Sequence, residues 1–170
     1  MRIVIVIMFS WAVVGCSPKP PTEHHILPVG FSGVYKIEKV QNHAGGYQID
    51  GHRYIFTIPK SGVLRVAPDV FVTYCRPCNG LTATFADGPQ EISLYSPLTR
   101  PPDSALDAHM LLGLLGSNEA VWYAVGTHEQ LSVFLKQVRL QKYQNLERYL
   151  PPNMPFKAKY EVDKGEDGNS

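Results

Sequence analysis

Short runs of alternating apolar and polar residues, separated by glycine-centred turns, fill the chain from about residue 30 to residue 95. In the first run, Tyr35 and Ile37 share one face while charged residues lie between them, as in a half-buried strand. Turn signals recur at Gly45-Gly46, Asp50-Gly51, Asn79-Gly80 and Asp87-Gly88. Short strands at this spacing predict a mainly β fold, either an antiparallel β-sandwich or a small barrel, and we expect the sandwich.

The predicted strands cover residues 33–40, 47–49, 52–58, 63–67, 70–75, 81–85, 91–95 and 120–125. Ser104 with Asp107 forms a capping box that predicts a short helix, and Thr127 with Gln130 predicts a longer C-terminal helix toward Leu150. We therefore expect a single β-rich domain over residues 30–156. A charged, Gly-rich tail over residues 157–170 is expected to be disordered.

The apolar segment 105–115 has two interpretations. Its leucines recur at helical spacing, which favours a short helix that covers one face of the sandwich. The alternative is an exposed patch that docks a partner through Leu111 and Leu115.

The N-terminus has the form of an export signal. Arg2 precedes an apolar run from Ile3 to Val14, which is too short to span a ~30 Å hydrocarbon core but suits a signal peptide over residues 1–15. The run ends in Val13-Val14-Gly15-Cys16.

That ending resembles the lipobox of bacterial lipoproteins. The resemblance implies that Cys16 becomes the first mature residue, with a diacylglyceryl thioether and an N-acyl chain such as palmitate, and anchors the protein to the membrane. Ser17 after the cysteine implies the outer membrane of the cell envelope, with the domain facing the periplasm or the surface.

Residues 16–29 contain several prolines and few apolar groups, which predicts a semi-rigid tether. Within it, adjacent His24 and His25 are interpreted as solvated linker residues rather than as metal ligands.

Cys75 and Cys78 have the i, i+3 spacing shared by disulfide staples, redox dithiols and zinc knuckles. An exported chain meets an oxidising compartment, which favours a disulfide between them. Redox chemistry normally places this motif at a helix start, whereas Asn79-Gly80 predicts a turn here. Zinc would need further ligands, for which His43, His52, His109 and His128 have no defining spacing.

After removal of Arg2, 15 basic residues balance 15 acidic ones. A neutral chain gives no basic footprint for nucleic acid, and we expect no nucleic-acid partner, no metal and no cofactor. No catalytic motif is evident, so we expect a non-enzymatic binding or structural module with an unidentified envelope protein or ligand as partner. The alternative is a thiol–disulfide or metal-handling protein that uses Cys75 and Cys78.

Two further stretches, residues 28–33 (PVGFSG) and 50–66 (DGHRYIFTIPKSGVLRV), resemble the opening of an uncharacterised family of small bacterial envelope proteins. Residues 122–127 (WYAVGT) resemble its later strand end. The resemblance implies no activity and no catalytic residues. The same turn pattern is similar to that of transthyretin-like (prealbumin-like) sandwiches, which is an analogy of fold alone.

Overall fold

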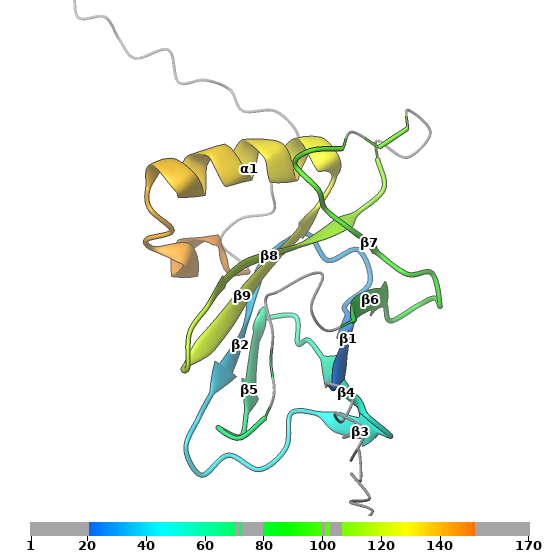
Figure 1. The fold of residues 1–170 in the computed structure, drawn as a ribbon, viewed down its shortest axis with the longest axis vertical. Helices are drawn as coiled ribbons and strands as arrows, with labels where there is room; N and C mark the ends of the chain where they lie inside the picture. Colours follow the sequence, from blue (N-terminus) through cyan, green and yellow to red (C-terminus); the bar gives the residue numbers. More distant parts are fainter. Residues whose placement is uncertain (1–20, 71, 73–79, 100, 103–106, 152–170) are drawn as a thin grey trace, which may run out of the picture.

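The computed structural model describes residues 21–70, 72, 80–99, 101–102 and 107–151. These residues form three layers, in which one sheet packs on a second sheet and a helix covers the outer face of the second (Figure 1). The elements are β1 (Thr22–Leu27), β2 (Gly33–Lys39), β3 (Gln48–Asp50), β4 (Arg53–Thr57), β5 (Val63–Val66), β6 (Leu81–Phe85), β7 (Ser93–Leu94), β8 (Met110–Gly116), β9 (Ala120–Gly126), α1 (His128–Leu140) and the 3-10 turn η2 (Leu146–Tyr149).

The two sheets are mixed. Sheet A has the strand order β3-β4-β1-β6, and sheet B has the order β5-β2-β9-β8-β7. The predicted mainly β class is confirmed, whereas the predicted transthyretin-like antiparallel sandwich is not confirmed. Antiparallel pairs are present in β2–β9, β3–β4 and β8–β9, but the other pairs are parallel. β1 runs parallel to both β4 and β6, β2 runs parallel to β5, and β7 runs parallel to β8.

Most of the parallel pairs follow from the path of the chain between the sheets. From β1 to β2 the chain passes from sheet A to sheet B through a turn in which the Phe31 amide donates to the Pro28 carbonyl. It returns for β3 and β4, crosses again to β5, and crosses twice more at β6 and β7. The partners in the parallel pairs β1–β4, β1–β6 and β2–β5 are therefore separated by a crossing, so they do not form hairpins and need not be antiparallel.

The predicted helix over 105–115 is corrected by β8, which begins at Met110 and pairs with β9 along its length. Sheet B is covered on both faces, by sheet A on one and by α1 on the other. A strand buried on both faces reads as a continuous apolar run, which periodicity alone cannot distinguish from a buried helix. Residues 103–106, which include Ser104 of the predicted capping box, lie outside the described residues.

The predicted tether is wrong from Thr22 onward, because β1 is a central strand of sheet A. Its odd-numbered residues are buried and its even-numbered ones are partly exposed, the alternation of a strand between a core and solvent.

The capping box at Thr127 and Gln130 is confirmed: the Thr127 hydroxyl accepts from the Gln130 amide, and the Gln130 side chain accepts from the Thr127 amide. The helix ends at Leu140 rather than near Leu150. Four apolar side chains attach it to sheet B, namely Leu131, Phe134, Leu135 and Val138. No helix of the described ranges is long and apolar enough to cross a membrane.

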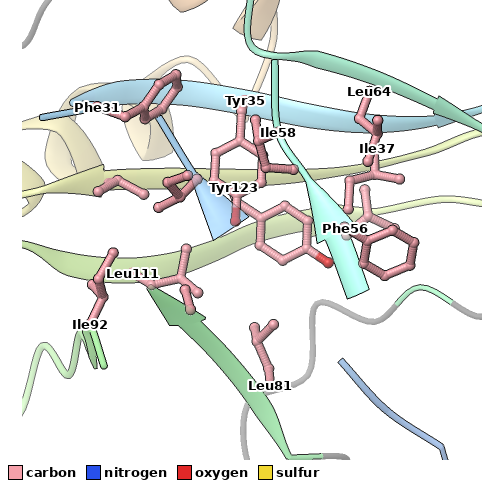
Figure 2. Close-up of a cluster of buried hydrophobic side chains, with 14 of the residues drawn as sticks. Phe31, Tyr35, Ile37, Phe56, Ile58, Leu64, Leu81, Ile92, Leu111 and Tyr123 are labelled. Atoms are coloured by element: carbon pink, nitrogen blue, oxygen red, sulfur yellow. The ribbon is translucent and has the colours of Figure 1, made fainter. Parts of the chain in front are cut away.

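The main core lies between the two sheets, where rings from β2, β4 and β9 gather (Figure 2). Figure 2 shows Tyr35 and Tyr123 beside each other, with Phe56 next to them. The phenol rings of Tyr35 and Tyr123 are stacked, with centroids 5.0 Å apart.

Candidate functional site

Two polar side chains of β1 point into this core. Glu23 and His25 are both fully buried, although charged and imidazole groups are costly to remove from water unless they find partners. They are placed there by the period-two geometry of β1, which turns residues 23, 25 and 27 toward sheet B.

Both nitrogens of the His25 ring have a partner. Its Nδ1 lies 2.6 Å from the Tyr35 hydroxyl oxygen, and its Nε2 lies 3.3 Å from Oε2 of Glu23. The Tyr35 hydroxyl and the Glu23 side chain therefore bond to opposite nitrogens of the ring. The Tyr123 hydroxyl also hydrogen-bonds to the Glu23 side chain. The result is a continuous chain of hydrogen bonds from Tyr35 through His25 and Glu23 to Tyr123, which we call the buried relay.

Three aromatic rings enclose the imidazole. The edges and faces of Tyr35, Phe56 and Tyr123 meet His25 in T-shaped contacts, with centroids 5.8, 5.5 and 4.8 Å away. These rings come from β2, β4 and β9, so His25 is in contact with strands of both sheets.

This buried environment changes the pKa values of the two tyrosine hydroxyls. Burial, together with the negative charge of Glu23, raises the pKa of Tyr35 well above its ordinary value. Burial and the same carboxylate raise the pKa of Tyr123. Both phenols therefore stay protonated, and each can donate its hydrogen to the relay.

The chemistry open to the buried relay is limited by access. An acid–base pair of carboxylate and imidazole can move protons, but a substrate must reach it within hydrogen-bond distance. Glu23 and His25 are completely covered, and among the described residues no buried side-chain nitrogen or oxygen lacks a partner. The relay is thus a satisfied internal network that ties β1 to β2 and β9.

His24 lies on the opposite, outer face of β1. Its Nδ1 is 2.8 Å from the hydroxyl of Thr82 and its Nε2 is 3.3 Å from that of Thr84, both on β6. Partial burial and then the positive charge of Arg53 lower the pKa of His24. The predicted solvated pair His24-His25 is therefore corrected, because both imidazoles are held by strand neighbours.

An open groove of about 580 Å³ lies over the outer face of sheet B, with Lys36, Glu38 and Trp122 among its lining residues. The Lys36 ammonium lies over the Trp122 ring at 5.3 Å and 3.2 Å from a Glu38 oxygen. Burial would raise the pKa of Glu38, but hydrogen bonds and charge from Lys36 and Arg65 outweigh it and lower this pKa. The charge of Glu38 is therefore already paired with those of Lys36 and Arg65.

The sequence-predicted docking pair is separated by the structure. Leu111 is fully buried in the main core, which corrects its assignment to a docking surface, whereas Leu115 is 42% exposed. Cys16, Cys75 and Cys78 lie outside the described residues. Within the described ranges, no three His, Cys, Asp or Glu side chains come together as a metal site requires.

Sequence reasoning missed Glu23 and His25. The six residues TEHHIL show no apolar alternation, because two of the three core-facing positions are polar. One signal could have indicated the pair: Glu23 and His25 are two residues apart, so in any strand their side chains lie on the same face.

No protein-family model matches the chain, and no curated protein matches it in sequence. The resemblance to an uncharacterised envelope family therefore stays a prediction. Among solved structures, the chain is similar to one described as "Putative Lipoprotein from Bacillus anthracis", with a TM-score of 0.35 and 10% identity over 76% of this chain and 97% of that one. A similarity this low supports no conclusion about this chain.

Proposed function

We propose that the protein is an envelope lipoprotein, anchored through acylated Cys16 and acting as a non-enzymatic structural or binding module on the outer membrane. The observation that carries the proposal is the lipobox-like Val13-Val14-Gly15-Cys16 directly behind an apolar run of signal-peptide length. Several acyl chains on one residue give durable anchoring, because each buried CH2 contributes about 0.8 kcal/mol.

The non-enzymatic part is supported by the buried relay. Among the described residues, Glu23 and His25 form a pair suited to acid–base chemistry, and full burial keeps a substrate from reaching them. Their contacts instead join β1 to sheet B, which suits a rigid scaffold placed directly behind an anchor.

The test is the intact mass of the mature protein purified from the envelope of a two-membrane bacterium. We expect a chain that begins at Cys16 and carries a diacylglyceryl group and an acyl chain. The matched variant Cys16→Ser should lose both the lipid mass and the membrane association. A wild-type chain with no lipid on Cys16 would refute the anchored-lipoprotein proposal.

The same cells test the proposed Cys75–Cys78 disulfide. Thiols trapped by alkylation in whole cells should be absent from this pair, since a staple stays oxidised in an oxidising compartment. A reduced, readily alkylated pair would instead favour the thiol–disulfide or metal-handling alternative.

A further inference from the structure

The anchor and the first strand are close along the chain. β1 begins at Thr22, six residues after Cys16, whereas a longer tether was expected. An extended chain spans at most about 3.3–3.6 Å per residue, so Thr22 lies within roughly 20 Å of the lipidated residue. This step rests on the proposed function, because it requires lipid on Cys16.

The β3–β4 hairpin lies beside Thr22. Thr22 pairs with Arg53 in the parallel register of β1 and β4, and its amide donates to the His52 carbonyl at 2.9 Å. Arg53 pairs in turn with Asp50 across the hairpin, whose turn is centred on Gly51 with φ +60°. On the other side of β1, Gly80 and the start of β6 also lie next to Thr22 and Glu23. The short distance to Cys16 thus places this end of sheet A, which includes the hairpin, close to the bilayer surface.

The side chains of the hairpin suit that surface. Ile49 is 60% exposed although it is a large aliphatic residue, and Tyr47 and Tyr54 lie half-buried beside it with ring centroids 5.6 Å apart. Tyrosine rings are enriched at membrane interfaces, where one end is apolar and the other is wet. Arg53 and His52 are exposed on the same hairpin, and a guanidinium binds lipid phosphate well.

The opposite end of the molecule provides an internal contrast. In Figure 1 the long axis is vertical, with β3 and β4 at the bottom and α1 at the top. Leu140, the last residue of α1, is 85% exposed. It matches Ile49 in character but lies far from the start of β1.

We infer that the β3–β4 hairpin, residues 47–54, docks on the lipid headgroups of the membrane that holds Cys16, with Ile49 inserted at the boundary between headgroups and acyl chains. The domain then has a membrane-facing end at this hairpin, and α1 is presented away from the membrane.

The experiment uses full-length lipidated protein in vesicles of phosphatidylethanolamine and phosphatidylglycerol. Part of the lipid is replaced by phosphatidylcholine brominated close to its headgroup, which quenches nearby tryptophan fluorescence. One variant carries Ile49→Trp and the matched control carries Leu140→Trp. The mature wild type contains Trp122 alone and supplies the background.

We expect the fluorescence added by Ile49→Trp to fall by about half or more in brominated vesicles, because interfacial side chains reach only about 5–10 Å into the bilayer. The fluorescence added by Leu140→Trp should be the same in brominated and in unbrominated vesicles. Equal quenching of the two reporters, or no quenching of the Ile49→Trp reporter, overturns the docking inference.

Intact mass of the same samples separates the two proposals. A lipidated, vesicle-bound protein without quenching at Ile49→Trp refutes the docked hairpin and leaves the anchor intact. A sample without lipid on Cys16 refutes the anchor, and the docking inference that rests on it is refuted with it.

Discussion

The hydroxyl oxygen of Tyr35 on β2 lies 2.6 Å from Nδ1 of His25 on β1, joining the two sheets through a hydrogen bond in a fully buried setting. Through the other ring nitrogen, His25 reaches Glu23, and Glu23 reaches Tyr123. Sheet A and sheet B are therefore held by a polar network as well as by the apolar side chains around it. Such networks fix one arrangement of a core, because any other arrangement leaves buried polar groups without partners.

Tyr35→Phe tests the value of this bond. The change removes one oxygen atom and leaves Nδ1 of His25 buried without its hydrogen-bond partner, so the free energy of unfolding should fall by about 1–3 kcal/mol. Urea denaturation followed by circular dichroism measures the loss. The control is Tyr47→Phe at the half-buried edge of the core, which should change stability by no more than about 0.5 kcal/mol. If both variants lose a similar free energy of unfolding, the hydrogen bond between Tyr35 and His25 does not stabilise the fold more than an ordinary tyrosine hydroxyl does.

Alkaline unfolding tests the raised pKa values of Tyr35 and Tyr123. In the unfolded chain both phenols lose their protons near the ordinary value of 10.0, whereas in the folded chain they keep them to higher pH. The unfolded state then binds fewer protons, so stability that is complete below this pH is lost as pH rises above it. Each buried phenol should contribute a slope of about 1.4 kcal/mol per pH unit.

Urea denaturation at a series of pH values between about 8 and 11 measures that slope, since the unfolded phenol titrates near 10. The double variant Tyr35→Phe, Tyr123→Phe should be less stable at neutral pH but lose stability more slowly above pH 10. If the free energy of unfolding of this variant falls with pH as steeply as that of the wild type, groups other than Tyr35 and Tyr123 cause the alkaline loss of stability.

The sequence predicted those parts of the fold that depend on local pattern. The alternation in residues 33–39, the glycine turns and the Thr127–Gln130 capping box each act within a few residues, and each appears in the structure. Strand pairing could not be predicted in the same way, because β1 meets β4 and β6 only after the chain has crossed to sheet B and back.

The candidate site was missed for a related reason. Glu23 and His25 were interpreted as linker residues because their partners, Tyr35 and Tyr123, lie on other strands and come close only in the folded protein. Local composition indicates polarity, but burial is decided by neighbours distant in sequence.

Leu111→Ser and Leu115→Ser test the corrected assignment of β8. Leu111 is fully buried between the sheets, so its loss should cost at least the 2–5 kcal/mol typical of Leu→Ala, with a further penalty for the buried hydroxyl. Leu115 is 42% exposed, and its replacement should cost less than about 1 kcal/mol. Chemical denaturation of both variants measures the difference. A folded, stable Leu111→Ser protein would contradict the buried position.

Thr127→Ala tests how far the capping box supports α1 on sheet B. The Thr127 hydroxyl accepts from the Gln130 amide at the first turn of the helix, and losing a cap of this kind costs about 0.5–2 kcal/mol. Gln130→Ala removes the reciprocal bond to the Thr127 amide. Because the two bonds form one motif, the double variant should lose less than the sum of the single losses. Ser132→Ala, at a helix position that takes no part in the cap, should change stability by no more than about 0.5 kcal/mol. If the losses in free energy of unfolding at Thr127 and Gln130 are strictly additive, the two bonds act independently. If Ser132→Ala loses as much stability as Thr127→Ala, the cap itself contributes little to the attachment of α1.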